Sequence, residues 1–476
     1  MKSNPNQLRK IIYALVIVGL FGAMWPYGLW LNKVKSEKDL GEATIGQIDT
    51  GDIMLKLALL GGARGVAANY LWSRAEGLKK AQEWDELKST IDFITRLQPH
   101  FLSVWTFQGW NLAYNVSVEW DAPEDKYDWI KQGIKFLQEG VRKNRRSPDL
   151  KWDTAWTYYH KLGFADETII LRRLLRDDTD EVFKFDPEEQ VVRNDNFQLG
   201  RGWFLQSMRI VDTGVGERLN SGTEMDVDAT FYVDAPSQRK GREGDLAFRS
   251  MASHAQTRYA AGLEKESIQG VAATFGEVAK SEWAKALSDW ETFGRYEFLA
   301  HNDKNIKIRI DECTNPAIFF GLSENARYWT DRWGSQMNYP YWKDRCTAEL
   351  TDEGVAARRL FYEGTKAYKS ADFPLAVEKF KQGLDIWKVL LGKHDSYRND
   401  DLNQRDTGLI VRRYIRSLRQ YGKDVPDDTP FLELAKATEG SFAPDPFDAL
   451  EMMPTSATAA GAASGSPTAQ PKAAPR

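Results

Sequence analysis

The chain has 476 residues, a length that suits about three domains or one long array of repeats. Hydrophobic residues make up 42% and charged residues 28%, which is ordinary for a globular protein and excludes a chain that is disordered throughout. The 64 basic and 68 acidic residues nearly cancel, so the protein as a whole has no strong attraction for nucleic acid or acidic lipid.

Residues 11–31 form an uncharged, largely apolar stretch that can span a bilayer core of about 30 Å as a helix. Trp25, Tyr27 and Trp30 gather near its end, as aromatic residues do at a membrane interface. A cleaved signal peptide would have a shorter apolar region and a small-residue cleavage site close behind it. We therefore expect a single-pass anchor in the cytoplasmic membrane, with a cytoplasmic leader over 1–10 and the remaining chain in the periplasm.

Residues 53–180 have the apolar pattern of paired helices. One face of a predicted helix begins at Leu71, and the same pattern returns 34 residues later, starting at Trp105. Pro99 stands between the two copies, where it ends one helix and permits the next. A third copy starts at Trp152. These spacings predict helical repeats over this region.

The clearest copy is LFYEGTKAYKSADFPLAVEKFKQGLDIW, residues 360–387. Gly364 and Gly383 would let two antiparallel helices approach closely, with large aromatic side chains beside the crossing. Pro374 falls in the first turn of the second helix, where proline is tolerated. A helix ended by Gly422 would cap the array, so we expect a repeat and its capping helix over 353–422.

This pattern resembles the tetratricopeptide repeat, most strongly over 360–387, less over 71–118 and least over 126–164. The strings LGGARGVAANYLWSRA (60–75) and NYPYWKDRC (338–346) also resemble segments of uncharacterised membrane-anchored bacterial repeat proteins, planctomycete ones among them. The resemblance implies an all-α fold in which stacked helix pairs form an α-solenoid, with a concave face that binds a peptide or a partner helix. It implies no enzymatic activity.

Other stretches depart from the repeat pattern. Residues 183–245 are rich in Gly and Asp and predict an irregular insertion, either a functional loop or an insertion packed on the array. A further helical pair is expected over 246–296, followed by an aromatic-rich irregular segment over 297–350. From 441 to 476 the composition shifts to Ala, Ser, Thr, Pro and Gly, which predicts a disordered tail.

The two cysteines, Cys313 and Cys346, both lie in the aromatic-rich segment. An oxidising compartment would allow them to form a disulfide. The sequence does not fix the distance between them, so two free thiols are the alternative.

No motif for catalysis or cofactor binding is found. The five histidines form no HxxxH or HExxH pattern, and the chain contains neither a Cys-x-x-Cys nor a GxSxG motif. GGARG (61–65) lacks the Lys-Ser/Thr ending of a phosphate loop. Basic runs at 141–146 and 412–419 are typical of solvated helix faces. We expect no cofactor, no metal site and no nucleic-acid partner.

Polar side chains on the first helix of each pair would line the concave face and are the candidate partner-binding residues: Arg74, Gln108, Asn111, Asn115, Lys366 and Lys369. The sequence thus predicts a non-enzymatic, membrane-tethered scaffold that binds another protein at the cell envelope. One alternative is a structural subunit of a larger envelope complex that buries its aromatic-rich segment over 319–342. The other is an enzyme with its site in 183–245 and 297–350. The oligomeric state is left open.

Overall fold

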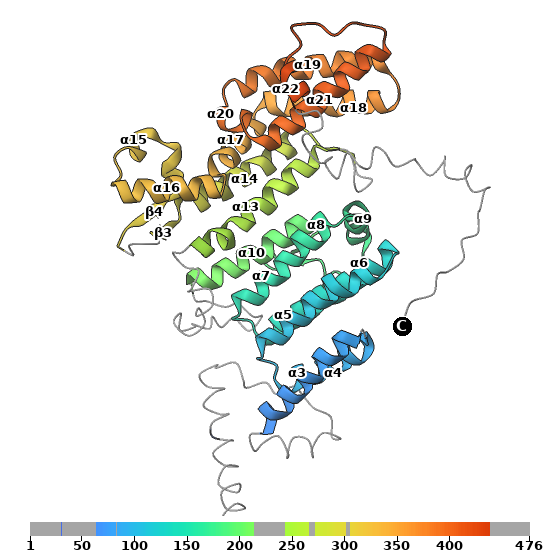
Figure 1. Cartoon of the computed structure of the whole chain (residues 1–476), viewed down its shortest axis with the longest axis vertical. Helices are drawn as coiled ribbons and strands as arrows, with labels where there is room; N and C mark the ends of the chain where they lie inside the picture. The colour runs from blue at the N-terminus through green and yellow to red at the C-terminus, as the bar shows by residue number, and fades with distance from the viewer. Residues whose placement is uncertain are drawn as a thin grey trace, which may run out of the picture. The chain divides into compact units, whose positions relative to one another are not determined.

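The structure is a computed structural model that describes residues 63–81, 83–213, 243–265, 272–300 and 305–437, together with the single residue Trp30. The chain divides into two compact units, residues 1–355 and residues 356–476, and each is described by itself. Helices make up most of the described residues and the strands are short (Figure 1), so the all-α fold class is confirmed for this part of the chain.

The predicted leader (1–10), the predicted anchor (11–31, apart from Trp30) and the predicted tail (441–476) lie outside the described residues. Of the helices that the structure describes, none combines the length and the apolar character needed to cross a bilayer. Attachment of the chain to a membrane therefore stays a prediction.

The described part of the first unit opens with two helix pairs whose members pack on each other. In the first pair, Leu87, Ile91 and Ile94 form an apolar stripe that packs on Ala75 and on Val104 of the next helix. In the second pair, the first helix continues into a π-helical segment and a short 3₁₀ turn. The elements are α3 (Ala63–Ala81) and α4 (Trp84–Leu97), then α5 (Leu102–Trp110), η2 (Asn111–Val116), η3 (Ser117–Glu119) and α6 (Pro123–Lys143).

Glycines allow the close crossing of α5 and α6. A Cβ added at Gly133 would lie 2.7 Å from the Gly109 carbonyl oxygen, and one added at Gly140 would lie 2.9 Å from the Trp105 ring. Neither position has room for a larger side chain. The small residues are therefore at the helix crossing, and Trp105 and Leu137 fill the space beside it.

The third pair is formed by helices that are far apart in the sequence. α7 packs on α10, which comes after three intervening elements and a two-stranded antiparallel sheet with Phe185 opposite Val192. The elements are α7 (Pro148–Trp156), the π-helical η4 (Thr157–Lys161), α8 (Leu162–Phe164), α9 (Thr168–Asp177), β1 (Phe185–Asp186), β2 (Val191–Val192) and α10 (Asn196–Thr213).

The prediction that residues 183–245 are irregular is wrong for α10. The glycines in LGRGWF suggested a loop, but they pack: Gly200 lies against Ala155 and Tyr159, and Gly202 lies against the Asp186 carboxylate. Asp195 also caps the helix, because its carboxylate accepts hydrogen bonds from the backbone N–H groups of the next turn. Residues 214–242 of the predicted insertion lie outside the described residues.

A fourth pair, α13 (Glu243–Leu263) and α14 (Glu277–Arg295), occupies the region where the sequence predicts a helical pair, and α13 also packs on α10. Trp283 and Trp290 of α14 are fully buried. Their indole N–H groups donate to Glu264 and Thr257 of the facing helix region at 3.0 and 2.9 Å. Each tryptophan thus provides both apolar contact area and a buried hydrogen bond between the two helices.

The prediction that residues 297–350 are irregular is also wrong, because most of the segment is helical. Trp329 and Trp333 stand four residues apart and face the core, and Pro340 is accommodated in the first turn of its helix. The elements are the antiparallel strands β3 (Glu297–Leu299) and β4 (Lys307–Arg309), then η5 (Ile310–Thr314), α15 (Pro316–Phe319), α16 (Glu324–Gln336) and α17 (Tyr339–Glu349).

Cys313 and Cys346 are free thiols in the structure, so the disulfide considered from the sequence is not formed. The two side chains have different neighbours. Cys346 is buried beside the Thr257 hydroxyl of α13, whereas Cys313 lies against Gly334 of α16. Burial raises the pKa of each thiol to about 12, which keeps both protonated at neutral pH.

The second unit begins within α18 and contains the helices of the clearest repeat copy. Gly364 and Gly383 each face the aromatic ring of the other helix: a Cβ added at Gly364 would lie 2.8 Å from Phe380, and one added at Gly383 would lie 2.8 Å from Phe361. Asp372 caps the second helix. The elements are α18 (Asp352–Lys369), α19 (Phe373–Leu391), α20 (Asp395–Arg398), α21 (Asp401–Gln420) and α22 (Leu432–Ala437).

Candidate functional site

The first helices of the second and third pairs both end in a π-helical turn. η2 follows α5 and η4 follows α7, and the two π segments contact each other. A π turn holds more residues than an α turn, so side chains four residues apart come more nearly into line, and such turns are frequent at functional sites. Tyr114 of η2 and His160 of η4 meet here, with the Tyr114 hydroxyl 3.3 Å from His160 Nδ1.

Aromatic rings stack along α7, η4 and α8 at intervals of four residues. Trp152 and Trp156 are 5.4 Å apart and almost parallel, Trp156 and His160 are 4.8 Å apart, and His160 and Phe164 are 5.9 Å apart. All these values are distances between ring centroids. The stack runs along one face of three consecutive elements.

A second stack on α5 and η2 joins the first one. Trp110 and Tyr114 lie 5.9 Å apart with an angle of 18° between the ring planes, and Tyr114 in turn lies 5.9 Å from His160. Trp110 is 46% exposed and Phe164 is 43% exposed, although both are large apolar side chains. We call this surface the aromatic stripe; it consists of Phe107, Trp110, Tyr114, Trp152, Trp156, His160 and Phe164.

Cations lie over the faces of the rings. The Lys79 ammonium is 4.7 Å from the Phe107 ring centre and 5.7 Å from that of Trp110, and the Lys161 ammonium is 5.3 Å from that of Tyr114. Arg258 of α13 lies over Phe164. Within the described part of the chain, neither Lys79 nor Lys161 forms an ion pair with a carboxylate.

Partial burial shifts the pKa values of the polar groups on and beside the stripe. It lowers the pKa of His160, with help from the neighbouring positive charge of Lys161, so the imidazole is neutral at neutral pH. Burial raises the pKa of Tyr114 well above its usual range, so the phenol stays protonated. Burial also lowers the pKa of Lys161. The stripe therefore combines apolar rings, a neutral imidazole and positive charges.

Three of the residues predicted from the sequence lie on α5 and η2 beside the stripe. The prediction that Gln108 and Asn111 are exposed is wrong: they are 1% and 0% exposed, because α4, α6 and α7 all contact α5. The Asn115 side chain, half-buried, donates a hydrogen bond to Asn111 Oδ1 at 2.8 Å. Among the described residues, the Gln108 amide and Asn111 Nδ2 have no hydrogen-bond partner.

The other three predicted residues are exposed, and one of them belongs to the first unit. Arg74 forms a 3.2 Å ion pair with Glu86 on α4. Lys366 and Lys369 stand on α18 in the second unit. Within the first unit, Arg74 is thus paired on α3 and α4, whereas Gln108, Asn111 and Asn115 lie on α5 and η2.

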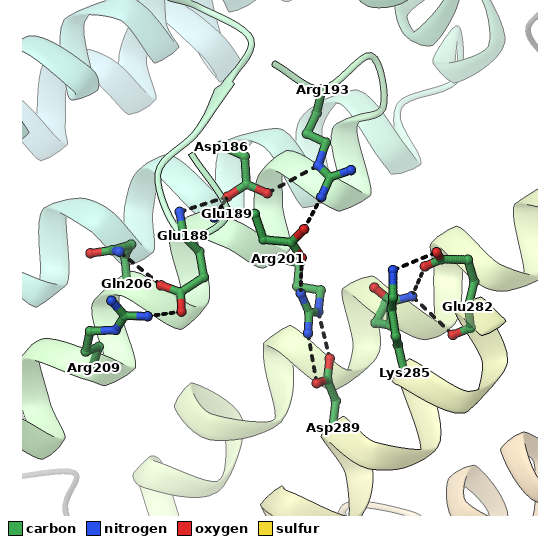
Figure 2. A network of polar contacts seen from close by, with 11 residues as sticks. Asp186, Glu188, Glu189, Arg193, Arg201, Gln206, Arg209, Glu282, Lys285 and Asp289 are labelled. Atoms are coloured by element: carbon green, nitrogen blue, oxygen red, sulfur yellow. Dashed lines mark hydrogen bonds and ion pairs between the residues drawn. The ribbon is translucent and has the colours of Figure 1, made fainter. Parts of the chain in front are cut away.

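A second cluster of polar residues holds the β1–β2 turn against α10 and α14. Figure 2 shows Arg201 between Glu189 and Asp289; its guanidinium donates to both Asp289 oxygens, at 2.7 and 3.0 Å. Asp186 accepts hydrogen bonds from the backbone N–H groups of Glu188 and Glu189. Since each acidic side chain of the cluster binds a cationic side chain, we interpret it as structural.

Figure 2 also shows Glu188 bound to Gln206 and Arg209, and a separate contact between Glu282 and Lys285. Across the described residues, no three His, Cys, Asp or Glu side chains are grouped closely enough to hold a metal ion.

The aromatic stripe is not among the predicted sites, although its spacing is visible in the amino-acid sequence. Trp152, Trp156, His160 and Phe164 recur every four residues, and so do Trp110 and Tyr114. Such a pattern is equally typical of a buried helix face. The signal that separates the two cases is exposure, which depends on the neighbouring helices.

No known family model matches the chain, and no curated protein or solved structure is significantly similar to it.

Proposed function

We propose that this protein is a helical-repeat scaffold that binds an extended segment of a partner protein along the aromatic stripe. The observation that carries the proposal is the continuous row of ring contacts from Trp110 to Phe164, with both of these large apolar side chains left nearly half exposed. Exposed apolar surface of this kind is typical of interaction sites, and Trp and Tyr supply much of the binding energy at protein interfaces.

The same rings favour a protein ligand that lies across more than one helix. The stripe uses the first helices of two successive pairs, which is where a stacked helical repeat presents its binding surface. Tyr114 and His160 join the two helices, so a ligand on one helix also touches the other. A single extended segment can follow such a row.

We further propose that the repeats are of the tetratricopeptide type and that residues 11–31 tether them to the bacterial cytoplasmic membrane. The glycine crossings at α5–α6 and at α18–α19 support the first part, because small residues meet large aromatic ones there in both units. The uncharged stretch over 11–31 supports the second part. A scaffold of this kind would hold its partner at the membrane surface.

The test is site-specific photo-cross-linking of the full-length chain in its native membrane. A photoreactive phenylalanine analogue is placed at Phe107, Trp110 or Phe164, and in a matched control at Phe320, which is 70% exposed but lies outside the stripe. We expect the three stripe positions to cross-link to the same region of one partner protein. The Phe320 position should not.

Substitution of Trp110 measures how much its ring contributes to partner binding. We expect Trp110→Ala to weaken capture of the cross-linked partner by roughly tenfold or more, because hot-spot aromatic residues contribute about 2 kcal/mol or more. Phe320→Ala serves as the control. Cross-links from the stripe only to lipid, or equal capture by both variants, would contradict the proposed function.

A structural subunit of a larger complex is the second candidate, and a separate exposed patch favours it. Ile318, Phe320 and Tyr328, around α15 and the start of α16, are 48%, 70% and 54% exposed. Cross-links from Phe320 rather than from the stripe, together with aggregation of the purified chain, would support this candidate instead.

A further inference from the structure

We infer that the bound segment is acidic, and that Lys79 and Lys161 bind two of its carboxylates at either end of the Trp110–Tyr114 stack. This inference rests on the proposed function of the stripe as a peptide-binding surface. It specifies that the ligand carries carboxylates and that Lys79 and Lys161 bind them.

The first argument is the state of the two lysines. Both are half-buried, both have the ammonium over an aromatic ring, and neither has a carboxylate partner within the described residues. Half-buried lysines nearby are paired: Lys126 binds Glu167, and Lys131 binds Asp178 at 2.7 Å. A partly desolvated charge without a partner is costly. Lys79 and Lys161 therefore suit an anionic partner from outside the described chain.

The second argument is the electrostatics of the rings. An aromatic ring has a negative face and a positive edge. In the stripe the faces of Trp110 and Tyr114 lie toward each other and toward the lysine ammonium groups, so we expect a ligand to meet the ring edges. A row of positive edges between two ammonium groups attracts carboxylates and carbonyl oxygens.

The third argument concerns Lys161 itself. Burial lowers its pKa, and the positive charge of Lys126 acts in the same direction. Glu167 and Asp166 raise the pKa of Lys161 through longer-range attraction, but Glu167 is already bound to Lys126. A carboxylate that contacts Lys161 would stabilise its charged form.

Geometry limits the spacing of the two carboxylates. The two ammonium groups lie at most about 17 Å apart, the length of the Lys79–Trp110, Trp110–Tyr114 and Tyr114–Lys161 distances laid end to end. An extended chain advances about 3.3 Å per residue, and alternate residues share a face. Residues i and i+4 share a face at about 13 Å, which is the longest same-face spacing within this limit, because residues i and i+6 lie about 20 Å apart. We expect glutamates at i and i+4 to bind best.

The experiment measures fluorescence anisotropy of labelled 12-residue peptides with the full-length chain in a neutral detergent. The peptides contain two Glu residues at spacings of two, three, four or six in a Gly/Ser/Pro background. An otherwise identical peptide carries Gln in place of both Glu residues. We expect the spacing of four to bind most tightly and the Gln peptide to bind at least tenfold more weakly.

Substitutions of Lys79 and Lys161 test whether each lysine binds one of the two glutamates of the peptide. Lys79→Met and Lys161→Met should each weaken binding of the spacing-four peptide by roughly tenfold, because each removes one charge and keeps the aliphatic stem. Lys161→Arg should retain binding. Lys80→Met is the matched control, since Lys80 is exposed on the same helix as Lys79 and should have no effect. Lys161→Glu should bind a peptide with one Glu replaced by Lys better than the unchanged chain does.

The outcomes separate the inference from the proposed function. Equal binding of the Glu and Gln peptides, unaffected by Lys79→Met and Lys161→Met but abolished by Trp110→Ala, would overturn the acidic ligand and leave the peptide-binding stripe standing. Binding of a polyuronate oligosaccharide, with no binding of any peptide, would overturn both.

Discussion

Tyr114 is the residue at which the two stacks of the stripe meet. Its ring lies between Trp110 and His160, its hydroxyl contacts His160 Nδ1, and Lys161 covers its face. These contacts come from two different helices. The Tyr114 side chain therefore joins the ring stack on α5 and η2 to the ring stack on α7, η4 and α8. The neutral state of His160 preserves the contact at neutral pH.

His254 is a second histidine whose surroundings determine its charge. Its ring lies edge-on to Trp290 at 4.8 Å and to Trp342 at 5.0 Å. Burial, assisted by the positive charge of Arg258, lowers the pKa of His254 to about 3. An exposed histidine has a pKa of about 6.5. Between these two values the unfolded chain binds a proton that the folded chain does not.

We predict that His254 makes the protein less stable as the pH falls from about 6.5 toward about 3, with no contribution above pH 6.5. The loss is at most about 1.4 kcal/mol per pH unit in this window. Denaturant unfolding at pH 7.5 and pH 5.0 measures it. His254→Phe keeps a ring between the two tryptophans and removes the titration, so the variant should lose less stability than the unchanged chain. Equal losses would contradict the assignment.

At the scale of elements, glycine crossings and π turns determine how helices meet. In α5 and α6 the glycines let the backbones approach, and in α18 and α19 each glycine makes room for a phenylalanine of the opposite helix. The π turns act at the ends of α5 and α7, where they align rings four residues apart. The helix crossings and the alignment of the rings together determine where the aromatic stripe lies.

We predict that Gly364→Ala and Gly383→Ala each destabilise the second unit by about 1–3 kcal/mol, because the new methyl group would overlap a phenylalanine ring. Gly77→Ala on α3 is the control, since nothing lies within 4 Å of its added Cβ and alanine favours the helix by up to about 1 kcal/mol. Thermal unfolding followed by calorimetry measures all three variants. A stable Gly364→Ala variant would show that the crossing is looser than described.

At the scale of the first unit, polar contacts connect segments that are distant in the sequence. Arg201 of α10 binds Asp289 of α14 and Glu189 of the β1–β2 turn. The network ties the third helix pair, its inserted turn and the fourth pair to one another. Because α7 and α10 belong to the third pair, this network also supports α7, which carries Trp152 and Trp156 of the stripe.

We predict that Arg201→Met destabilises the first unit by about 2 kcal/mol, since it leaves the largely buried Asp289 carboxylate without its partner. Arg209→Met, which removes the more exposed pair with Glu188, should cost less than about 1 kcal/mol. Denaturant unfolding measures both. Replacing Asp289 by Leu in the Arg201→Met background should recover much of the loss; no recovery would contradict the ion-pair explanation.

The fold was largely predictable wherever one local pattern was decisive. The periodicity over 71–118 and 360–387 indicated the helices, and Pro374 and Gly422 indicated a start and an end, because both act through their own backbone geometry. The helices over 196–213 and 324–349 were missed, because Gly200, Gly202 and Pro340 are typical of loops until their packing is known. Local propensity was outweighed there by tertiary contacts.

The amino-acid sequence by itself determined the helical class, the main helix pairs and the small residues at their crossings, since these follow from periodicity and side-chain size. Only the tertiary structure decided which polar residues are buried and which aromatic residues are exposed. Gln108 and Asn111 are covered because three helices surround α5, whereas Trp110 and Phe164 remain half exposed because no described helix covers that side. Exposure depends on neighbours that are distant in the sequence, and no local pattern contains that information.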